Sequence, residues 1–127
     1  MRVFKTRFFA KFARKEKIKD AALCEAVARA GRGLIDATLC NGLIKQRVAR
    51  QGEGRSGGFR TIIAVTFGDR AVFSHGFAKS ETENIDEAEL VEHKLLASRV
   101  LPMSTAAIEA ALKNKFLSEV NCGGHEV

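Results

Sequence analysis

The sequence of 127 residues contains no tryptophan and no tyrosine, and its only proline is Pro102. The nine phenylalanines must therefore supply all large aromatic surface, whether for a core or for stacking on a ligand. No apolar stretch approaches the ~20 residues that a membrane-spanning helix needs. The N-terminal segment carries a charge every two or three residues and lacks the apolar centre of a secretory signal. We therefore expect a cytoplasmic protein.

Cysteine is also scarce, with Cys24, Cys40 and Cys122 making an odd number without the spacing of a disulfide framework. We expect Cys24 and Cys40 to be small core residues in a reduced protein. Cys122 and His125 have ligand-like spacing, but no second pair of ligands accompanies them. The sequence therefore predicts neither a metal site nor another cofactor.

Charge is distributed unevenly along the chain. Residues 1–79 hold 17 Lys and Arg against 6 Asp and Glu, a net charge of +11. Residues 80–127 hold 4 against 9, a net charge of −5. A basic body attracts phosphate groups, and binding that depends on such charge weakens steeply with salt. Composition therefore favours a polyanionic partner, with RNA as the leading candidate.

Hydrophobic periodicity predicts a pair of helices at each end of the chain. A short strand near Arg2–Phe4 is expected to precede a helix over about residues 6–17. Phe4, Phe8 and Phe12 recur at helical spacing with Phe9 beside them, and this phenylalanine stripe is expected to face the core. Asp20 is the expected N-cap of a second helix, which ends near Gly31 and Gly33.

At the other end, Ser80 or Asp86 is expected to begin a helix that runs to about Leu101, where Pro102 stops it. Its apolar face is predicted to consist of Leu90, Leu95, Leu96 and Val100. Ser104 or Thr105 caps a last helix with the apolar side Ile108, Leu112, Phe116 and Leu117.

Three strands are expected between the helix pairs, over residues 43–50, 59–67 and 70–77. A mobile glycine-rich loop at 51–58 and a two-residue hairpin loop at Gly68–Asp69 connect them into an antiparallel meander. The order of elements predicts one α+β domain over residues 1–127, with the helices packed on one face of the sheet.

Six cations gather around the glycine-rich loop and the end of the meander, namely Lys45, Arg47, Arg50, Arg55, Arg60 and Lys79. Strand alternation places Leu43, Lys45, Arg47 and Ala49 on one side of the first strand. A sheet face that concentrates cations repels itself unless an anion lies there. The segment therefore predicts a surface that binds phosphate.

Three segments resemble the RelE/ParE superfamily of toxins from type II toxin–antitoxin systems, and most closely its HigB-type branch. They are GLIKQRVA at residues 42–49, GRSGGFR at 54–60 and GFAKS at 76–80. The resemblance covers roughly residues 3–100 and leaves out an extra helix at about 103–118. It implies a small twisted antiparallel sheet with two helices on one side. It also implies inhibition of translation, in most members by cutting mRNA in the ribosomal A site.

The resemblance, taken position by position, points to the cations as the residues that support this chemistry. Arg47 and Arg60 are expected to clamp the scissile phosphate, because the planar guanidinium contacts two phosphate oxygens at once. Lys45 is the candidate base, or the cation that makes the 2′-hydroxyl easier to deprotonate. Lys79 holds phosphate or donates the proton to the departing 5′-oxygen.

The identity of the proton donor stays open at this stage. Some ribosome-dependent relatives use a tyrosine near the C-terminus, and this chain has none. His75 shares strand parity with Phe73 and Phe77, so it is either a core histidine or the general acid. His93 and His125 are expected to be bystanders.

Further contacts with RNA are expected from four residues. Arg50 and Arg55, beside or on the glycine-rich loop, are expected to grip the RNA backbone. Phe59 or Phe77 is expected to stack on a base.

Three functions remain open from the sequence. The leading hypothesis is a ribosome-dependent mRNA endonuclease, for which the resemblance implies the ribosome, mRNA and an antitoxin, small and acidic or of the helix-turn-helix type, as partners. The second is a toxin that poisons DNA gyrase, as in the ParE branch, which would need no acid–base residues. The third is a non-catalytic RNA-binding module or an inactivated toxin, in which GRSGG is only a hairpin loop.

Overall fold

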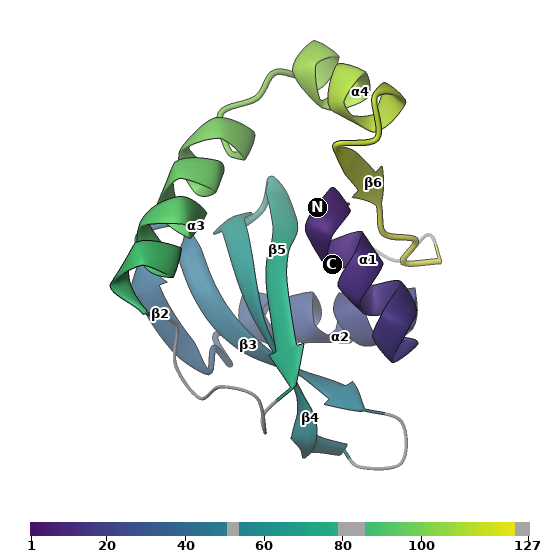
Figure 1. Ribbon diagram of the computed structural model, residues 1–127, viewed down its shortest axis with the longest axis vertical. Coiled ribbons are helices and arrows are strands. Elements are labelled where there is room, and N and C mark those ends of the chain that lie inside the picture. Colours follow the sequence, from purple (N-terminus) through teal and green to yellow (C-terminus); the bar gives the residue numbers. More distant parts are fainter. Residues whose placement is uncertain (51–53, 79–85, 124–127) are drawn as a thin grey trace.

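A computed structural model describes residues 1–50, 54–78 and 86–123, without the side chains of 54–57 and 78. Six strands form one mixed sheet in the order β2-β3-β4-β5-β1-β6, in which β1 runs parallel to β5 and the other pairs are antiparallel (Figure 1). The strands are β1 (Arg2–Thr6), β2 (Ala37–Cys40), β3 (Leu43–Arg50), β4 (Gly54–Thr66), β5 (Arg70–Ala78) and β6 (Leu117–Glu119). The helices are α1 (Arg7–Glu16), α2 (Asp20–Gly31), α3 (Glu87–Val100) and α4 (Thr105–Lys113). The predicted α+β class and the β3–β4–β5 meander are confirmed.

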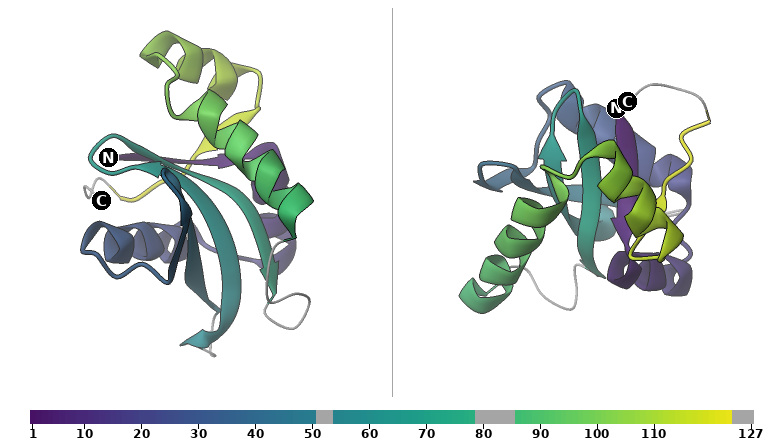
Figure 2. Two further views of the ribbon diagram at one scale, coloured as in Figure 1. Left: turned by 90° about the vertical axis from the view of Figure 1, so that its left-hand side faces the viewer. Right: turned by 90° about the horizontal axis from the view of Figure 1, so that it is seen from above.

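Helices cover both faces of the sheet, so the prediction that they share one face is wrong. Figure 2 shows α2 and α3 on opposite sides of the strands. Alternating strand residues divide the core accordingly. On the α1–α2 face the buried cluster includes Phe9, Leu23, Val27, Ile44 and Phe73. On the opposite face, which we call the α3 face, the buried cluster comprises Phe4, Leu43, Ile62, Val100 and Ile108.

The predicted phenylalanine stripe is broken because the first helix begins only at Arg7. Thr6 is its N-cap, and the Thr6 hydroxyl accepts a hydrogen bond from Phe9 N at 3.1 Å. Phe4 therefore lies on β1, where it is buried on the α3 face. Within α1, Phe9 enters the core, whereas Phe8 is 80% exposed.

Several connections differ from the predictions, and two strands were not predicted at all, β2 and β6. Residues 54–58 belong to β4 instead of a loop. The hairpin between Thr66 and Arg70 has three loop residues, with Gly68 at φ 84° and Asp69 N bonded to Thr66 O, as in a type II turn. Leu117 lies in β6, not on the last helix.

The C-terminal helices begin at predicted caps. The Asp86 carboxylate accepts from Glu89 N at 2.8 Å, and the Ser104 hydroxyl accepts from Ala107 N at 3.1 Å. On α3, Leu95 is 56% exposed, so it does not belong to the apolar face. Among the described helices none is long and apolar enough to cross a membrane by itself, although α3 and α4 pass such a test as a pair bent by 117°.

The C-terminal segment returns to the N-terminal half, which the sequence did not indicate. Cys24 and Cys122 form a disulfide across 98 residues, so the prediction of a reduced Cys24 is wrong. Cys40 is free and half-buried. Asp20 is not a helix cap, since Lys19 occupies that position and the Asp20 carboxylate accepts from Asn121 N at 2.8 Å. These contacts fasten the end of the chain beside α2.

Two glycines of the motifs are explained by close packing. A Cβ atom at Gly58 would collide with the carbonyl oxygen of Val48 on the paired strand. One at Gly76 would lie 2.6 Å from Cε2 of Phe12 and 2.9 Å from Cε2 of Phe9. Without a side chain at 76, α1 packs directly on β5. The glycines therefore position the strands that carry the cations and a histidine.

Candidate functional site

The sheet register brings four of the predicted catalytic residues onto the α3 face in two neighbouring rows. In one row Arg47 of β3 lies opposite Arg60 of β4, which lies opposite Phe77 of β5. In the next row Lys45 lies opposite Ile62, which lies opposite His75. Because the three strands form a continuous ladder, these side chains are held on rigid backbone.

His75 reaches this face through a β-bulge. Ile62 pairs with His75 and Ile63 pairs with Phe73, so Ser74 is an extra residue on β5. Phe73 is in the core on the α1–α2 face, while His75 lies level with Ile62 on the α3 face. The expected shared parity of His75 and Phe73 is therefore wrong, and the bulge turns the histidine towards the cations.

Arg47 and Arg60 are opposed like charges with unused donors. The Nε atoms of both are buried, and neither finds a hydrogen-bond partner among the described residues. A buried donor without a partner costs about 1–3 kcal/mol, and like charges directly opposite each other destabilise a sheet. An anion with several acceptor oxygens, such as a phosphate, would satisfy both donors and screen the repulsion.

The backbone of Arg47 is fixed by groups from the surrounding elements. Asp36 accepts a hydrogen bond from Arg47 N at 2.6 Å, and the guanidinium of Arg29 donates to Arg47 O. Arg29 itself is 4% exposed and pairs with Glu25 at 2.9 Å. The Arg47 backbone is therefore anchored while its own side chain keeps an unused donor.

A pair of histidines, His75 and His93, lies beside the row that holds Arg47 and Arg60. The rings of His75 and His93 lie 5.2 Å apart between centroids, and Nδ1 of His93 lies 3.3 Å from the Ser74 hydroxyl. When that hydroxyl donates to Ile62 O at 3.2 Å, Nδ1 of His93 is the donor in the contact, and Nε2 is left as an acceptor. Burial first, and then His75, hold the pKa of His93 below its usual value, while Glu92 acts in the opposite direction.

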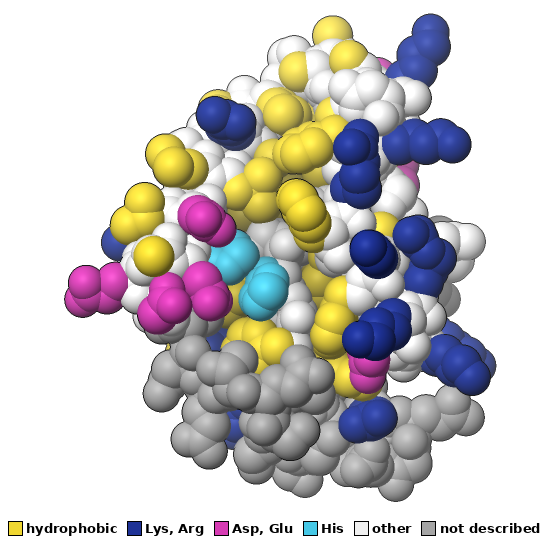
Figure 3. Space-filling model, in the orientation of Figure 1, with side chains coloured by type: hydrophobic (Ala, Val, Ile, Leu, Met, Phe, Trp, Pro, Cys, Tyr) yellow, Lys and Arg dark blue, Asp and Glu magenta, His cyan; other side chains and the backbone are white. Residues whose placement is uncertain are grey.

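A cavity of about 310 Å³ opens beside the two histidines. Ser74, His75, Glu92 and His93 give it polar walls, and Phe8 and Phe116 are among its apolar lining residues. Figure 3 shows the histidine pair between acidic side chains on one side and a strip of apolar side chains on the other. Beyond that strip, lysines and arginines line the margin of this view.

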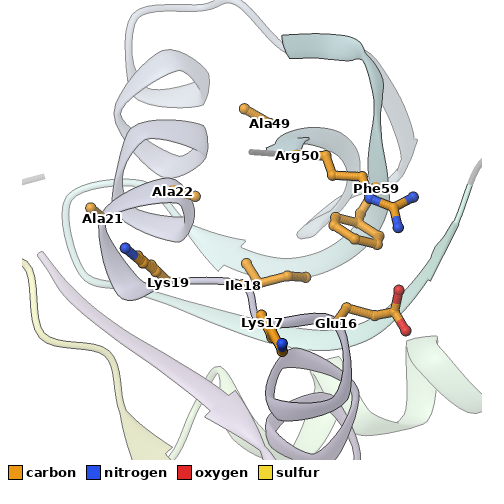
Figure 4. A pocket seen from close by; sticks show the side chains of 9 residues that line it. All are labelled: Glu16, Lys17, Ile18, Lys19, Ala21, Ala22, Ala49, Arg50 and Phe59. Carbon is orange, nitrogen blue, oxygen red and sulfur yellow. The ribbon is translucent and has the colours of Figure 1, made fainter. Parts of the chain in front are cut away.

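Of the four residues expected to contact RNA, Phe77 lies in the row of Arg47 and Arg60, whereas Arg50 and Phe59 lie elsewhere. Arg50 and Phe59 lie on the α1–α2 side, where alternation along β3 and β4 places them. There the Arg50 guanidinium lies 5.1 Å from the centre of the Phe59 ring, in a groove that Lys17 and other residues line (Figure 4). Ala49 lines the same groove, so it does not share the side of Lys45 and Arg47 as predicted. Phe59 and Phe77 are 2% and 4% exposed, so neither has an open ring face for a base.

Lys45 is half-buried and takes part in an interaction with another group. Two other predicted residues are not fully placed. Lys79 lies outside the described residues, as does the side chain of Arg55. Within the described ranges, no group of three or more His, Cys, Asp or Glu side chains is arranged to hold a metal ion.

Sequence reasoning missed His93 and Phe8. His93 lies three residues after Leu90 and three before Leu96, which placed it on the predicted inner face of α3. That signal was available, but only the fold reveals that His75 lies opposite. Phe8 had no comparable signal, because its exposure depends on where α1 begins.

Comparison with known families gives one match. The model of the family described as the RelE toxin of the RelE/RelB toxin–antitoxin system matches residues 1–120. The match extends through α4 and β6, beyond the range of about 3–100 that the motifs indicated. Comparison with curated proteins and with solved structures gives no significant match. The chain belongs to the RelE family of toxins from toxin–antitoxin systems.

Proposed function

We propose that the protein inhibits translation by cutting mRNA on the ribosome, and that the Arg47–Arg60 pair binds the scissile phosphate. The observation that carries the proposal is the pair of opposed, half-buried arginines whose buried Nε atoms have no partner among the described residues. Fixed cations in a partly dry site stabilise a phosphorane-like transition state better than water does. A sheet that only had to fold would not need this arrangement.

The cleavage is an attack by the 2′-oxygen on the adjacent phosphorus, with breakage of the bond to the 5′-oxygen. Lys45 takes the proton from the 2′-hydroxyl or stabilises the resulting oxyanion, and Arg47 and Arg60 orient the phosphate for in-line displacement. His75, one row from Arg60 in the same sheet face, supplies the proton for the 5′-oxygen. Lys79, which follows β5, would add a further cation.

The family implies a cognate antitoxin, and the proposal extends this partner to a helix-turn-helix protein of the HigB-associated kind. Action on the ribosome would place the toxin in the cytoplasm. Its net charge of +6 favours encounter with ribosomal RNA and mRNA.

The test is a translating extract that receives purified protein, followed by mapping of mRNA ends. Wild-type protein is expected to produce cuts at codons in the A site, and no cuts in the same mRNA without ribosomes. Arg60→Ala is expected to lower the cleavage rate by about 100- to 1000-fold, the usual loss on removing one group that stabilises transition-state charge. Arg32→Ala is the matched control, because Arg32 is an exposed arginine just after α2.

Three outcomes would contradict the proposal. Intact mRNA together with trapped gyrase–DNA complexes would identify a gyrase poison instead. RNA binding without any cut would identify a non-catalytic RNA-binding module. Full toxicity of Arg60→Ala at normal protein levels would remove Arg60 from the reaction.

A further inference from the structure

The cavity beside the histidine pair, which we call the histidine pocket, is built from segments far apart in the sequence. Thr6 and Phe8 come from the start of the chain, Ser74 and His75 from β5, and His93 from α3. Its volume of about 310 Å³ lies at the lower end of the range for small-ligand sites. The pocket is therefore large enough for one ring system and too small for a folded RNA element.

An aromatic surface is available at this pocket. Phe8 is 80% exposed, the most exposed large apolar side chain in the described structure. It neighbours the fully buried Phe9 in α1, so the helix does not need the Phe8 ring for its packing. Phe116, which is half-buried, also lines the pocket. Exposed phenylalanine rings are stacking surfaces for unpaired bases.

The polar groups of the pocket are mainly acceptors. Glu92 contributes carboxylate oxygens, and the hydrogen bonds of Ser74 leave Nε2 of His93 as an acceptor. The lowered pKa of His93 favours that neutral form. Acceptors beside an aromatic surface suit a planar ring whose edge carries N–H donors. Guanine has two adjacent donors, N1–H and the 2-amino group, that a single carboxylate can accept.

The histidine pocket lies close to Arg60 of the arginine pair along the sheet. His75 lines the pocket, and it lies two residues along β5 from Phe77, the neighbour of Arg60. Two residues of a strand span about 7 Å, which is comparable to the separation between a base and the phosphate of its own nucleotide. One nucleotide could therefore occupy the pocket and the arginine pair together.

We propose that the histidine pocket binds one base of the RNA substrate, with guanine preferred, its ring stacked on Phe8 and its donor edge directed to Glu92. The inference rests on the proposed function, because it takes the ligand to be RNA. It adds a preference for a base that the protein itself reads. The pair of histidines then lies beside the bound nucleotide, where His75 can act on it.

The experiment measures binding of two fluorescein-labelled hexamers by anisotropy. Both are 2′-O-methyl RNA, which lacks the attacking hydroxyl and is not cut. One is all uridine, and the other has a single central guanosine. Wild-type protein is expected to bind the guanosine hexamer about tenfold more tightly, in line with the strength of base–aromatic stacking.

Two variants and one control locate the effect. Phe8→Ala and Glu92→Gln are expected to remove most of the tenfold preference while leaving binding of the uridine hexamer within about twofold. Neither side chain is part of a buried core, so both variants should fold. Phe67→Ala is the matched control, since Phe67 is 47% exposed in the β4–β5 turn, at the far end of these strands from His75. It is expected to keep the preference.

The outcomes separate this inference from the proposed function. Equal binding of both hexamers with a steep salt dependence would overturn the base pocket and leave the phosphate site standing. A preference that survives in both Phe8→Ala and Glu92→Gln would overturn it as well. If wild-type protein binds neither hexamer, the base pocket is overturned, whereas cleavage on the ribosome is decided separately by the mapping of mRNA ends in the translating extract.

Discussion

Gln46 and Arg47 are neighbours on β3, yet their side chains face opposite sides of the sheet and differ in burial and in hydrogen bonding. Gln46 is 0% exposed, and its amide is fully used, with Nε2 donating to Ala26 O and Leu34 O and Oε1 accepting from Asp36 N. Arg47 has a buried Nε without a partner among the described residues. The first pattern is that of a polar group that holds a fold together.

The same contrast separates the two faces of the sheet. The α1–α2 face has satisfied polar groups, an apolar core and the Cys24–Cys122 disulfide. The α3 face combines its own apolar cluster with opposed arginines, a half-buried lysine and two adjacent histidines. A protein tolerates such unfavourable groups where a ligand compensates them, so the contrast supports the proposal that the α3 face is the one that binds RNA.

The largest expected effect concerns the disulfide. Cys122→Ala should lower the free energy of unfolding by about 2–5 kcal/mol, because the bond closes a loop of 98 residues. Denaturant unfolding measures this. RNA affinity well below the midpoint should stay unchanged, since the bond lies on the α1–α2 side. Cys40→Ala is the control. A loss of RNA affinity in Cys122→Ala would contradict the idea that the α1–α2 face stabilises the fold while the α3 face binds RNA.

The neighbours themselves provide a matched pair of variants. Gln46→Leu should lower the free energy of unfolding by about 1–3 kcal/mol, because Asp36 N loses its acceptor and the carbonyls of Ala26 and Leu34 lose a donor. Arg47→Leu should change it by less than about 0.5 kcal/mol, since no acceptor is orphaned and the repulsion from Arg60 is relieved. Thermal melts and urea titrations compare them. Equal destabilisation would show that Arg47 is structural after all.

The salt dependence of RNA binding gives a smaller but specific signal. The slope of log affinity against log salt is about −0.7 for each neutralised phosphate of single-stranded RNA. Arg47→Leu should make the slope shallower by about 0.7, whereas Arg32→Ala should leave it unchanged. An unaltered slope in Arg47→Leu would mean that Arg47 does not contact phosphate.

The smallest effect is a pH dependence from His93. Its folded pKa lies below the unfolded value of 6.5, so at mildly acidic pH the unfolded state binds more protons. The free energy of unfolding should therefore fall as pH drops from about 6.5 through the folded pKa. His93 is flanked by His75 of β5 and Glu92 of α3. Denaturant unfolding of wild type and His93→Gln between pH 5 and 8 measures the difference, and identical profiles would contradict the assignment.

Much of the fold was accessible from local patterns. The bounds of β3 were predicted to the residue, and the caps Asp86 and Ser104 were recognised, because alternation and capping act over a few residues. The parallel pairing of β1 with β5, the strand β6 and the disulfide were not predicted. They join residues about 70 to 115 positions apart, and periodicity carries no information at that range.

The site divides in the same way. The sequence by itself determined that Lys45 and Arg47 share a face, that cations surround the glycine motifs, and that no tyrosine can donate the proton. Only the tertiary structure decided that Arg60 meets Arg47, that a register shift brings Ala49 to the groove beside Arg50, and that a bulge brings His75 next to His93. The physical reason is that alternation holds within an unbroken ladder. Register shifts, burial and unsatisfied donors are set by the strands and helices that pack around it.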